Sequence, residues 1–402
     1  MFKVYCRVYQ FIFKCAAVFL PWRKPELIEG EDCVLNLPAQ ISKDGIKNVL
    51  LVTGKGTMKR GSADKLLDAL QKEGITTVIY DNTVPNPTIS NIEEALSLYN
   101  ENNCGGIIAF GGGSPIDCAK GVGARVARPG KSVPQLKGYL KVRSKLPPFY
   151  AIPTTSGTGS EATVAAVVVN PDTHEKYSIS DLSLIPRVAV LDPLLTISMP
   201  QGITSSTGMD ALTHAVEAYI GHSNTAETRE MALKAVKLIF ENLYEAYCDG
   251  NNITARQNMQ RAAYFAGIAF TRAYVGNVHA IAHTLGGLYD TPHGFANAVI
   301  LPHVLDYYGQ CVYKKLSELA DAAGLQGETT EQKAKGFIGA VRELNAKMEI
   351  PETVDFILEA DIPVMVGHAF HEANPVYPVP QIFTREDFTA VIHRLMNNGG
   401  NK

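Results

Sequence analysis

The chain changes character near residue 198, and this change constrains its fold more than any other feature. Before it, short β-rich runs alternate with helical stretches such as 62–73 and 90–101; the β-rich runs lie at 48–53, 76–80, 106–110, 149–152, 164–170 and 188–191. Strands joined by helices in this way form a parallel sheet. After it, stretches with helical periodicity follow one another at 205–221, 224–248, 253–272, 277–288, 311–323, 330–347 and 384–397. The sequence therefore predicts an α/β N-terminal domain with a parallel sheet and an all-helical C-terminal domain.

We expect three segments: an apolar N-terminal extension at 1–29, the α/β domain at 30–198 and the helical domain at 199–402. The chain has 402 residues, of which 46% are hydrophobic and 19% charged, so it is long enough for two domains. A net charge of −3 without a basic stripe argues against a nucleic-acid partner. Seven scattered cysteines without a C-x-x-C pair favour neither a disulfide framework nor a structural zinc site, so we expect a cytoplasmic protein.

The first 22 residues are rich in aromatic and aliphatic side chains and precede the basic pair Arg23-Lys24. Arg7 and Lys14 interrupt this apolar stretch, and no run reaches the roughly 18–20 residues that a membrane span requires. A helix packed on the protein or facing another subunit is the favoured interpretation. A membrane-surface helix, and a signal or anchor, are the less favoured alternatives.

Polar residues with metal-ligand chemistry gather between residues 210 and 293. They are Asp210 and His214, four residues apart, His279 and His283, also four apart, and His293. Residues four apart on a helix project from one face, so each pair can direct two polar groups at one point. An isolated pair of such residues more often lies on an ordinary helix surface. Here, however, three of the ten histidines fall in the fifteen residues from His279 to His293, and the segment around them is small and apolar. We predict a divalent metal site that uses three or four of these side chains.

Two polar turns follow predicted strands in the first half. Gly111-Gly112-Gly113-Ser114 follows the strand that ends at Phe110, and Pro153 to Thr163 holds six hydroxyl groups and two glycines. Glycines at the start of a helix let the backbone approach a phosphate, although such a turn is structural in many proteins. Open α/β sheets bind ligands at this edge, so we expect a nucleotide cofactor between the two halves.

Taken together, four motifs closely resemble the iron-dependent (group III) alcohol dehydrogenase family. They are Gly111 to Asp117, Pro153 to Glu161, Gly208 to Glu217 and Thr291 to Gly294, and the resemblance runs from about residue 30 to residue 397. It implies a two-domain fold, an NAD or NADP cofactor, and Fe²⁺, with Zn²⁺ as the alternative, held by Asp210, His214, His279 and His293. It places His283 near the nicotinamide and the substrate, as the candidate for relaying the hydroxyl proton. The cofactor-binding residues that it implies are Gly54, Asn86, Gly112, Gly113, Ser114, Asp117, Thr154, Thr155, Thr158 and Lys176.

Cofactor choice depends on Gly54, where family members that prefer NAD tend to carry Asp. Without that carboxylate a 2′-phosphate is not repelled, and Lys55, Lys59 or Arg60 could bind it. The alternative is a plain turn with solvated lysines. The sequence slightly favours NADP.

The leading functional hypothesis is a metal-dependent, NAD(P)-linked alcohol dehydrogenase that acts mainly as an aldehyde reductase on small molecules and forms a homodimer or a higher homo-oligomer. A lyase resembling dehydroquinate synthase is an alternative. It would need several basic residues around the metal, and the stretch 271–301 offers only Arg272. A non-catalytic protein that binds metal and nucleotide is the third hypothesis.

Overall fold

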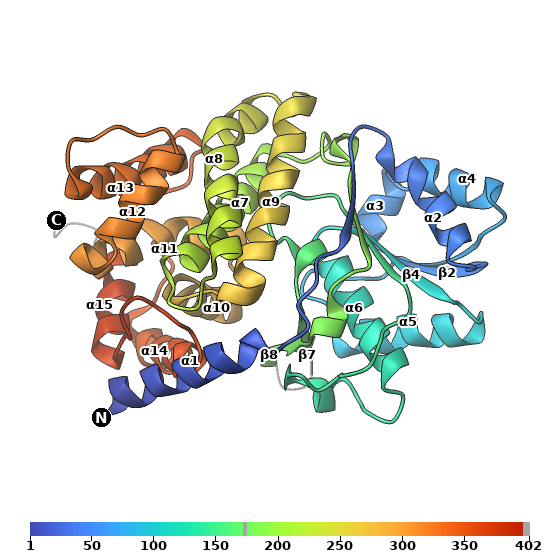
Figure 1. Cartoon of the computed structure of the whole chain (residues 1–402), viewed down its shortest axis with the longest axis horizontal. Coiled ribbons are helices and arrows are strands. Elements are labelled where there is room, and N and C mark those ends of the chain that lie inside the picture. Colours follow the sequence, from blue (N-terminus) through green and yellow to red (C-terminus); the bar gives the residue numbers. More distant parts are fainter. Residues whose placement is uncertain (172–174, 397–402) are drawn as a thin grey trace. The chain divides into compact units, whose positions relative to one another are not determined.

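The computed structural model describes residues 1–171 and 175–396 and separates into two compact units (Figure 1). One unit is Pro21–Ser198, and the other combines Met1–Leu20 with Met199–Lys402. The predicted fold class, an α/β domain with a parallel sheet and a helical domain, is confirmed. The structure divides the stretch 1–29, which the sequence predicts as one extension. Its first part is a helix of the helical unit, whereas Glu26–Glu29 is a strand of the sheet.

The α/β unit is built on a six-stranded sheet with the strand order β1-β9-β6-β4-β2-β3, and all neighbouring strands are parallel. The strands of this sheet are β1 (Glu26–Glu29), β2 (Asn48–Val52), β3 (Thr76–Tyr80), β4 (Gly106–Gly111), β6 (Phe149–Pro153) and β9 (Val188–Leu191). Strands β4, β6 and β9 are buried along their whole length. Such burial on both faces explains why these strands read as continuous apolar runs.

Helices cover both faces of this sheet. They are α2 (Leu37–Lys43), α3 (Lys55–Lys59), α4 (Asp64–Lys72), α5 (Ile89–Glu101) and α6 (Gly113–Ala127). Successive residues of β2 point to opposite faces, as the period of two requires. Leu50 packs in the core that holds residues of α5 and α6, and Leu51 packs in the core that holds residues of α2 and α4.

A smaller sheet with the order β5-β8-β7 lies in the same unit. It consists of β5 (Gly138–Tyr139), β7 (Ala165–Asn170) and β8 (Glu175–Ser180), and β7 pairs with β8 in antiparallel register. The sequence does not predict β1, β5 or β8. β1 and β5 have only four and two residues, and four of the six residues of β8 are polar or charged.

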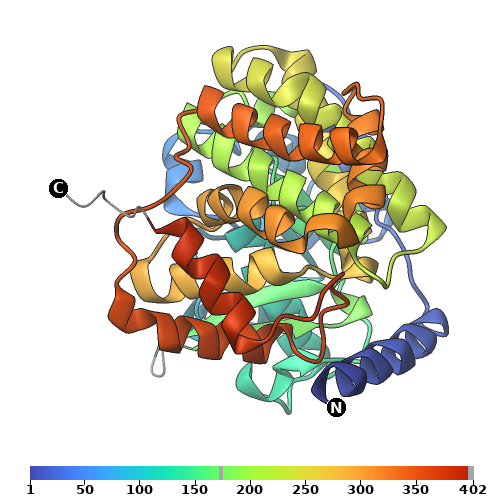
Figure 2. The same cartoon turned by 90° about the vertical axis from the view of Figure 1, so that its left-hand side faces the viewer.

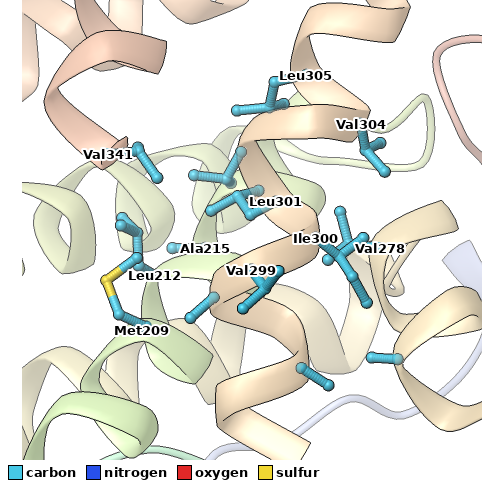
Figure 3. Close-up of a cluster of buried hydrophobic side chains, with 14 of the residues drawn as sticks. Met209, Leu212, Ala215, Val278, Val299, Ile300, Leu301, Val304, Leu305 and Val341 are labelled. Carbon is cyan, nitrogen blue, oxygen red and sulfur yellow. The ribbon is translucent and has the colours of Figure 1, made fainter. Parts of the chain in front are cut away.

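Within the described residues, the helical unit contains nine α-helices from its C-terminal segment and the N-terminal α-helix α1 (Phe2–Val18). Figure 2 shows this unit from the side. The nine are α7 (Gln201–Ile220), α8 (Ala226–Cys248), α9 (Ile253–Ala273), α10 (Asn277–Tyr289), α11 (His293–Tyr308), α12 (Tyr313–Ala322), α13 (Thr330–Lys347), α14 (Ile362–Ala373) and α15 (Arg385–Leu395). The predicted stretch 384–397 corresponds to α15, and residue 397 lies outside the described residues. Side chains of α7, α10, α11 and α13 interlock in the buried core of Figure 3.

Two helices of the helical unit, α11 and α14, are absent from the sequence prediction. α11 contains Pro302, which has no N–H to donate to the carbonyl of Ala298 four residues earlier. The side-chain amide of Asn345 donates to that carbonyl instead, at 2.7 Å. A contact from a distant helix therefore replaces the hydrogen bond that the proline removes, and a local pattern cannot reveal it.

No helix in the described part of the chain is long and apolar enough to cross a membrane.

Candidate metal and cofactor sites

The four predicted metal ligands come together in the helical unit. Asp210 and His214 lie one turn apart on α7, His279 lies in the first turn of α10, and His293 is the first residue of α11. One potential ligand atom from each residue lies within 4.8 Å of those of the other three. The rings of His214 and His279 stack at 4.6 Å between centroids, and Nε2 of His293 lies 3.5 Å from Oδ1 of Asp210.

The cluster is buried on one side and accessible on the other. Asp210 and His279 are each 2% exposed, whereas the side chain of His293 is 32% exposed. Burial, followed by the neighbouring imidazoles, lowers the pKa of His279 well below its ordinary value. A neutral imidazole is the form that binds a metal. Three imidazoles and one carboxylate are a donor set that suits a divalent cation such as Fe²⁺ or Zn²⁺, so the residues present fit the metal that the resemblance implies.

Glu217, two turns beyond Asp210 on α7, fixes the orientation of His279. Its buried carboxylate lies 2.6 Å from Nδ1 of His279 and accepts the N–H groups of Gly276 and Val278 at 2.7 and 2.8 Å. Burial raises the pKa of Glu217 to about 8, and the converging backbone N–H groups oppose this rise only in part. With Nδ1–H donated to this carboxylate, Nε2 of His279 is left for the cluster.

His283, one turn after His279 on α10, lies outside the four-residue set. Its ring stacks on that of His293 at 5.1 Å between centroids, and its side chain is 30% exposed. Nδ1 of His283 lies 2.6 Å from Oε1 of Glu372, which also accepts the hydroxyl of Tyr377 at 2.8 Å. His283 therefore has its own carboxylate partner and stands beside the predicted ligands.

Sequence reasoning missed Asn297, which lies one turn after His293 on α11. Its side-chain Nδ2 donates to Oδ1 of Asp210 at 2.7 Å and lies 3.2 Å from Nε2 of both His279 and His293. The signal was present, because His293 and Asn297 have the same spacing of four as the two pairs that suggested the site. The predicted ligand set contains only carboxylate and imidazole side chains, so it does not include this amide.

The start of α11 approaches α7 very closely at Gly294. A Cβ on Gly294 would lie 2.2 Å from the carbonyl oxygen of Ser206 and 3.2 Å from Cβ of Asp210. Only glycine fits this approach. The glycine after His293 therefore lets two ligand-bearing helices come together.

In the α/β unit, the two predicted phosphate-binding turns are neighbours. They follow β4 and β6, which are adjacent parallel strands, and the N–H of Thr154 donates to the carbonyl of Gly111 at 2.9 Å. A Cβ on Gly112 would lie 3.3 Å from Oγ1 of Thr155, and one on Gly113 would lie 2.9 Å from Cγ2 of Thr158. The glycines therefore permit close packing of the two turns and leave the start of α6 without side chains.

Three further predicted residues form one chain of contacts. Oγ of Ser114 accepts the N–H of Asn86 at 3.3 Å, and Nζ of Lys176 donates to Oδ1 of Asn86 at 3.0 Å. Asp117 differs from them. Its two oxygens accept the hydroxyl of Ser160 at 2.6 Å and the N–H of Val167 at 3.0 Å. These contacts tie α6 to the second turn and to β7, and contact of Asp117 with a cofactor stays a prediction.

A buried lysine beside these turns was also missed. Lys120 on α6 is fully buried, and its Nζ donates to Oγ of Ser160, to both oxygens of Thr163 and to the carbonyl of Ala165 at 2.8–3.1 Å. Burial lowers its pKa to about 8 and raises that of nearby Glu161 to about 7. Lys120 holds the loop that carries the hydroxyl groups, and no local pattern in the sequence indicates that this lysine is buried.

Gly54 follows β2, next to β4 in the sheet, and is the N-cap of α3 in extended backbone conformation. Lys55, Lys59 and Arg60, which come directly after it, are exposed. The three cationic side chains are therefore exposed to solvent, and they lie at the edge of the sheet where the glycine-rich turn also lies.

Two models of one known protein family together match nearly the whole length of the chain. Residues 25–193 match the iron-containing alcohol dehydrogenase family, and residues 204–396 match the C-terminal part of the same family. The chain belongs to the iron-containing alcohol dehydrogenase family. It is therefore an NAD(P)-dependent oxidoreductase, and the comparisons favour this over the lyase and non-catalytic alternatives.

Individual relatives in this family share most of their length with the chain. A 1,3-propanediol dehydrogenase of Klebsiella pneumoniae is 40% identical over 356 residues, which is 87% of this chain and 92% of the relative. An NADPH-dependent butanol dehydrogenase of Clostridium saccharobutylicum is 38% identical over 312 residues, 77% of this chain and 80% of the relative. The crystal structure of a 1,3-propanediol oxidoreductase superposes with a TM-score of 0.90 at 36% identity and covers 94% of this chain and 100% of its own.

Proposed function

We propose that this iron-containing dehydrogenase interconverts a small primary alcohol or diol and its aldehyde, with Asp210, His214, His279 and His293 as the metal ligands. The observation that carries the assignment is the meeting of these four side chains within 4.8 Å, although they come from three helices. The substrate class is supported by the relatives, which include enzymes named for 1,3-propanediol and butanol.

When bound, the two groups would supply the reactive chemistry: a divalent cation would polarise the carbonyl oxygen of the aldehyde, and a nicotinamide cofactor would supply or accept the hydride. The residues of the chain would hold the metal, orient its ligands and exchange a proton with the substrate. Glu217 keeps His279 in the tautomer whose Nε2 is available as a ligand. His283, with Nδ1–H donated to Glu372, has Nε2 left to give a proton to the nascent hydroxyl group or to take it in the opposite direction.

We propose that the α/β unit binds the cofactor through the start of α6 and the turn after β6. The backbone N–H groups after Gly112 favour a phosphate, because the first N–H groups of a helix lack partners within it. Ser114, Asn86 and Lys176 form a polar set that continues from this turn. Gly54 with the exposed Lys55, Lys59 and Arg60 supports a preference for NADP.

The four-ligand hypothesis is tested by His279→Ala and His293→Ala, with His371→Ala as the matched control. His371 is exposed on α14 and lies outside the four-residue set. We expect the first two variants to lose bound metal and to lose turnover by more than about 100-fold. This loss exceeds the effect typical of changing a residue that only hydrogen-bonds to a metal ligand. Metal content is measured by elemental analysis, and turnover with aldehydes and NADH or NADPH. Wild-type metal content and turnover in both variants would refute the assignment.

The cellular location and the oligomeric state are also part of this proposal. All seven cysteines are free, which supports a reducing, cytoplasmic location. A homodimer or higher homo-oligomer is proposed from the sequence, and light scattering on the metal-loaded protein measures its mass directly.

A further inference from the structure

The N-terminal helix α1 lies before the residues that match the iron-containing alcohol dehydrogenase family, which begin at residue 25. One side of this helix packs on the helical unit. Cys6 is fully buried there, in a small cluster with Val379 and Ile382, and Gln10, one turn later, is 6% exposed. A buried amide needs hydrogen-bond partners within the protein, so the partners of Gln10 show which part of the enzyme α1 holds.

The partners of Gln10 belong to the stretch 374–384, which joins α14 to α15. The structure describes this stretch throughout, and it contains neither helix nor strand. We call it the α14–α15 loop. The side-chain amide of Gln10 donates to the carbonyl of Tyr377 at 2.7 Å and to that of Pro375 at 3.1 Å. One side chain of α1 therefore uses both of its amide hydrogens on this loop.

Arg7 extends the attachment of α1 to the same loop. Its guanidinium donates to the carbonyls of Val379 and Pro380 at 2.8 and 2.7 Å, and to the side-chain oxygen of Gln10 at 2.9 Å. Prolines occupy positions 375, 378 and 380 of the loop, and a proline has no N–H to donate. The conformation of the loop therefore depends on donors from outside it, and α1 supplies donors to four of its carbonyls.

The α14–α15 loop carries a side chain that reaches the partner of His283. The hydroxyl of Tyr377 donates to Oε1 of Glu372 at 2.8 Å, and the same oxygen lies 2.6 Å from Nδ1 of His283. The backbone of Tyr377 is held at two points. Its N–H donates to the carbonyl of Ala373 at 2.8 Å, and its carbonyl accepts the amide of Gln10. A continuous series of contacts therefore runs from α1 through Tyr377 and Glu372 to His283.

We propose that α1 positions the histidine that exchanges the proton, with Gln10 and Arg7 as the positioning residues. The inference rests on the proposed function of His283. The side chains of His283 and Glu372 are each 30% exposed, so burial alone does not fix their orientation. The carboxylate that accepts Nδ1–H sets the orientation of the imidazole and leaves Nε2 for the substrate. Tyr377 limits the movement of that carboxylate, and α1 limits the movement of Tyr377.

This role predicts an effect on turnover rather than on binding. Arg7 and Gln10 donate their hydrogen bonds to the α14–α15 loop, whereas the predicted metal ligands lie on α7, α10 and α11. A proton-exchanging group must lie within hydrogen-bond reach of the substrate, so an imidazole that is held less firmly transfers its proton less often. Loss of the contacts from α1 should therefore lower kcat and leave the metal content and the cofactor KM unchanged.

The experiment is a double-mutant cycle in the full-length, metal-loaded protein, assayed with butanal and saturating NADPH or NADH. Gln10→Met removes the amide and keeps the length of the side chain, and Tyr377→Phe removes only the hydroxyl. Gln10→Met should lower kcat by roughly two- to tenfold, the factor that corresponds to the loss of one neutral hydrogen bond. In the Tyr377→Phe background it should lower kcat no further, because the path from α1 to Glu372 is already broken.

Phe11→Gln is the matched control, because Phe11 is the next residue on α1 and is 67% exposed, so this variant should have the kcat of the wild type. In Gln10→Met the N–H of His222 still donates to the carbonyl of Pro378, at 2.7 Å in the wild type, so the α14–α15 loop keeps an attachment and the variant should stay folded. Circular dichroism checks the folding. Arg7→Met is a second variant that should show the same non-additivity.

Three results would overturn the inference. Gln10→Met could have the kcat of the wild type, it could lower kcat equally in the Tyr377→Phe background, or Phe11→Gln could lower kcat to the same extent. Full turnover in His283→Gln would exclude the proton relay, and this inference with it. A loss of turnover in His283→Gln together with a wild-type kcat in Gln10→Met would overturn this inference alone and leave the proposed function intact.

Discussion

Replacing Glu217 by Gln tests whether the residue behind His279 controls metal affinity. The carboxylate has one oxygen that accepts Gly276 N–H and lies next to Nδ1 of His279, and a second oxygen that accepts Val278 N–H. An amide of the same shape keeps only one acceptor. It should place its oxygen beside Gly276 and His279, because the opposite orientation loses two hydrogen bonds rather than one.

The expected magnitude follows from these contacts. The variant loses the hydrogen bond from Val278 and the charge of the acceptor for His279, and a hydrogen bond to a charged group contributes about 1.5–3 kcal/mol. At about 1.4 kcal/mol for each factor of ten, the metal Kd should rise by roughly 10- to 100-fold. Changes to residues that orient metal-bound histidines typically have an effect of this size.

The measurement is a chelator competition that yields the metal Kd, with circular dichroism to show that the variant is folded. Glu372→Gln is the matched control, because Glu372 makes the same 2.6 Å contact with Nδ1 of His283, outside the ligand set. It should leave the metal Kd unchanged. The reasoning is refuted if Glu217→Gln binds metal as tightly as the wild type, or if Glu372→Gln weakens binding equally.

Four further changes test the other residues. Gly112→Val should raise the cofactor KM and leave metal content intact, because its side chain enters the turn at Thr155; an unchanged KM would show that the phosphate binds elsewhere. Gly54→Asp, at an extended backbone position, should lower the ratio of kcat/KM for NADPH over NADH by roughly tenfold or more, and an unchanged ratio would contradict the NADP preference. Burial raises the pKa of Glu161 from 4.5 to about 7, so its protonated form stabilises the native state fully below pH 4.5, and this contribution is lost as the pH rises to about 7. Urea unfolding should therefore show the wild type losing a few kcal/mol relative to Glu161→Gln over that range, and a constant difference would disprove it. His283→Gln should keep its metal but lose roughly 10²- to 10⁴-fold in kcat, whereas full turnover would exclude a proton-relay role.

The strands and the metal-ligand spacing could be predicted because their signals are local. β4, β6 and β9 are buried on both faces and read as short apolar runs, and a spacing of four residues on a helix is visible in any sequence. The resemblance to the alcohol dehydrogenases added the choice of His293 over His283 as a ligand, which spacing alone leaves open.

The residues that escaped prediction act through contacts between distant segments. Glu217 and His279 are 62 positions apart, Asn297 and Asp210 are 87 apart, and Lys120 reaches residues 40 to 45 positions away. Helix α11 was missed for the same reason, since Asn345, which satisfies the carbonyl freed by Pro302, is 47 positions from Ala298. No local periodicity carries such information. An amide or a glutamate in a helix reads as ordinary until the fold places it against a histidine.

The different roles proposed for His279 and His283 follow from their surroundings rather than from their chemistry. Both are imidazoles on one face of α10, and in both Nδ1 lies 2.6 Å from a glutamate. His279 is 2% exposed and surrounded by three other imidazoles, a place where a positive charge is costly, so it is suited to remain neutral and bind a cation. The side chain of His283 is 30% exposed, and its glutamate also accepts the hydroxyl of Tyr377, so an imidazolium there retains both solvent and a hydrogen-bonded carboxylate. A group that must gain and lose a proton in each turnover needs both charge states to be accessible. We therefore infer that one turn of helix separates a histidine suited to hold the metal from one suited to exchange the proton.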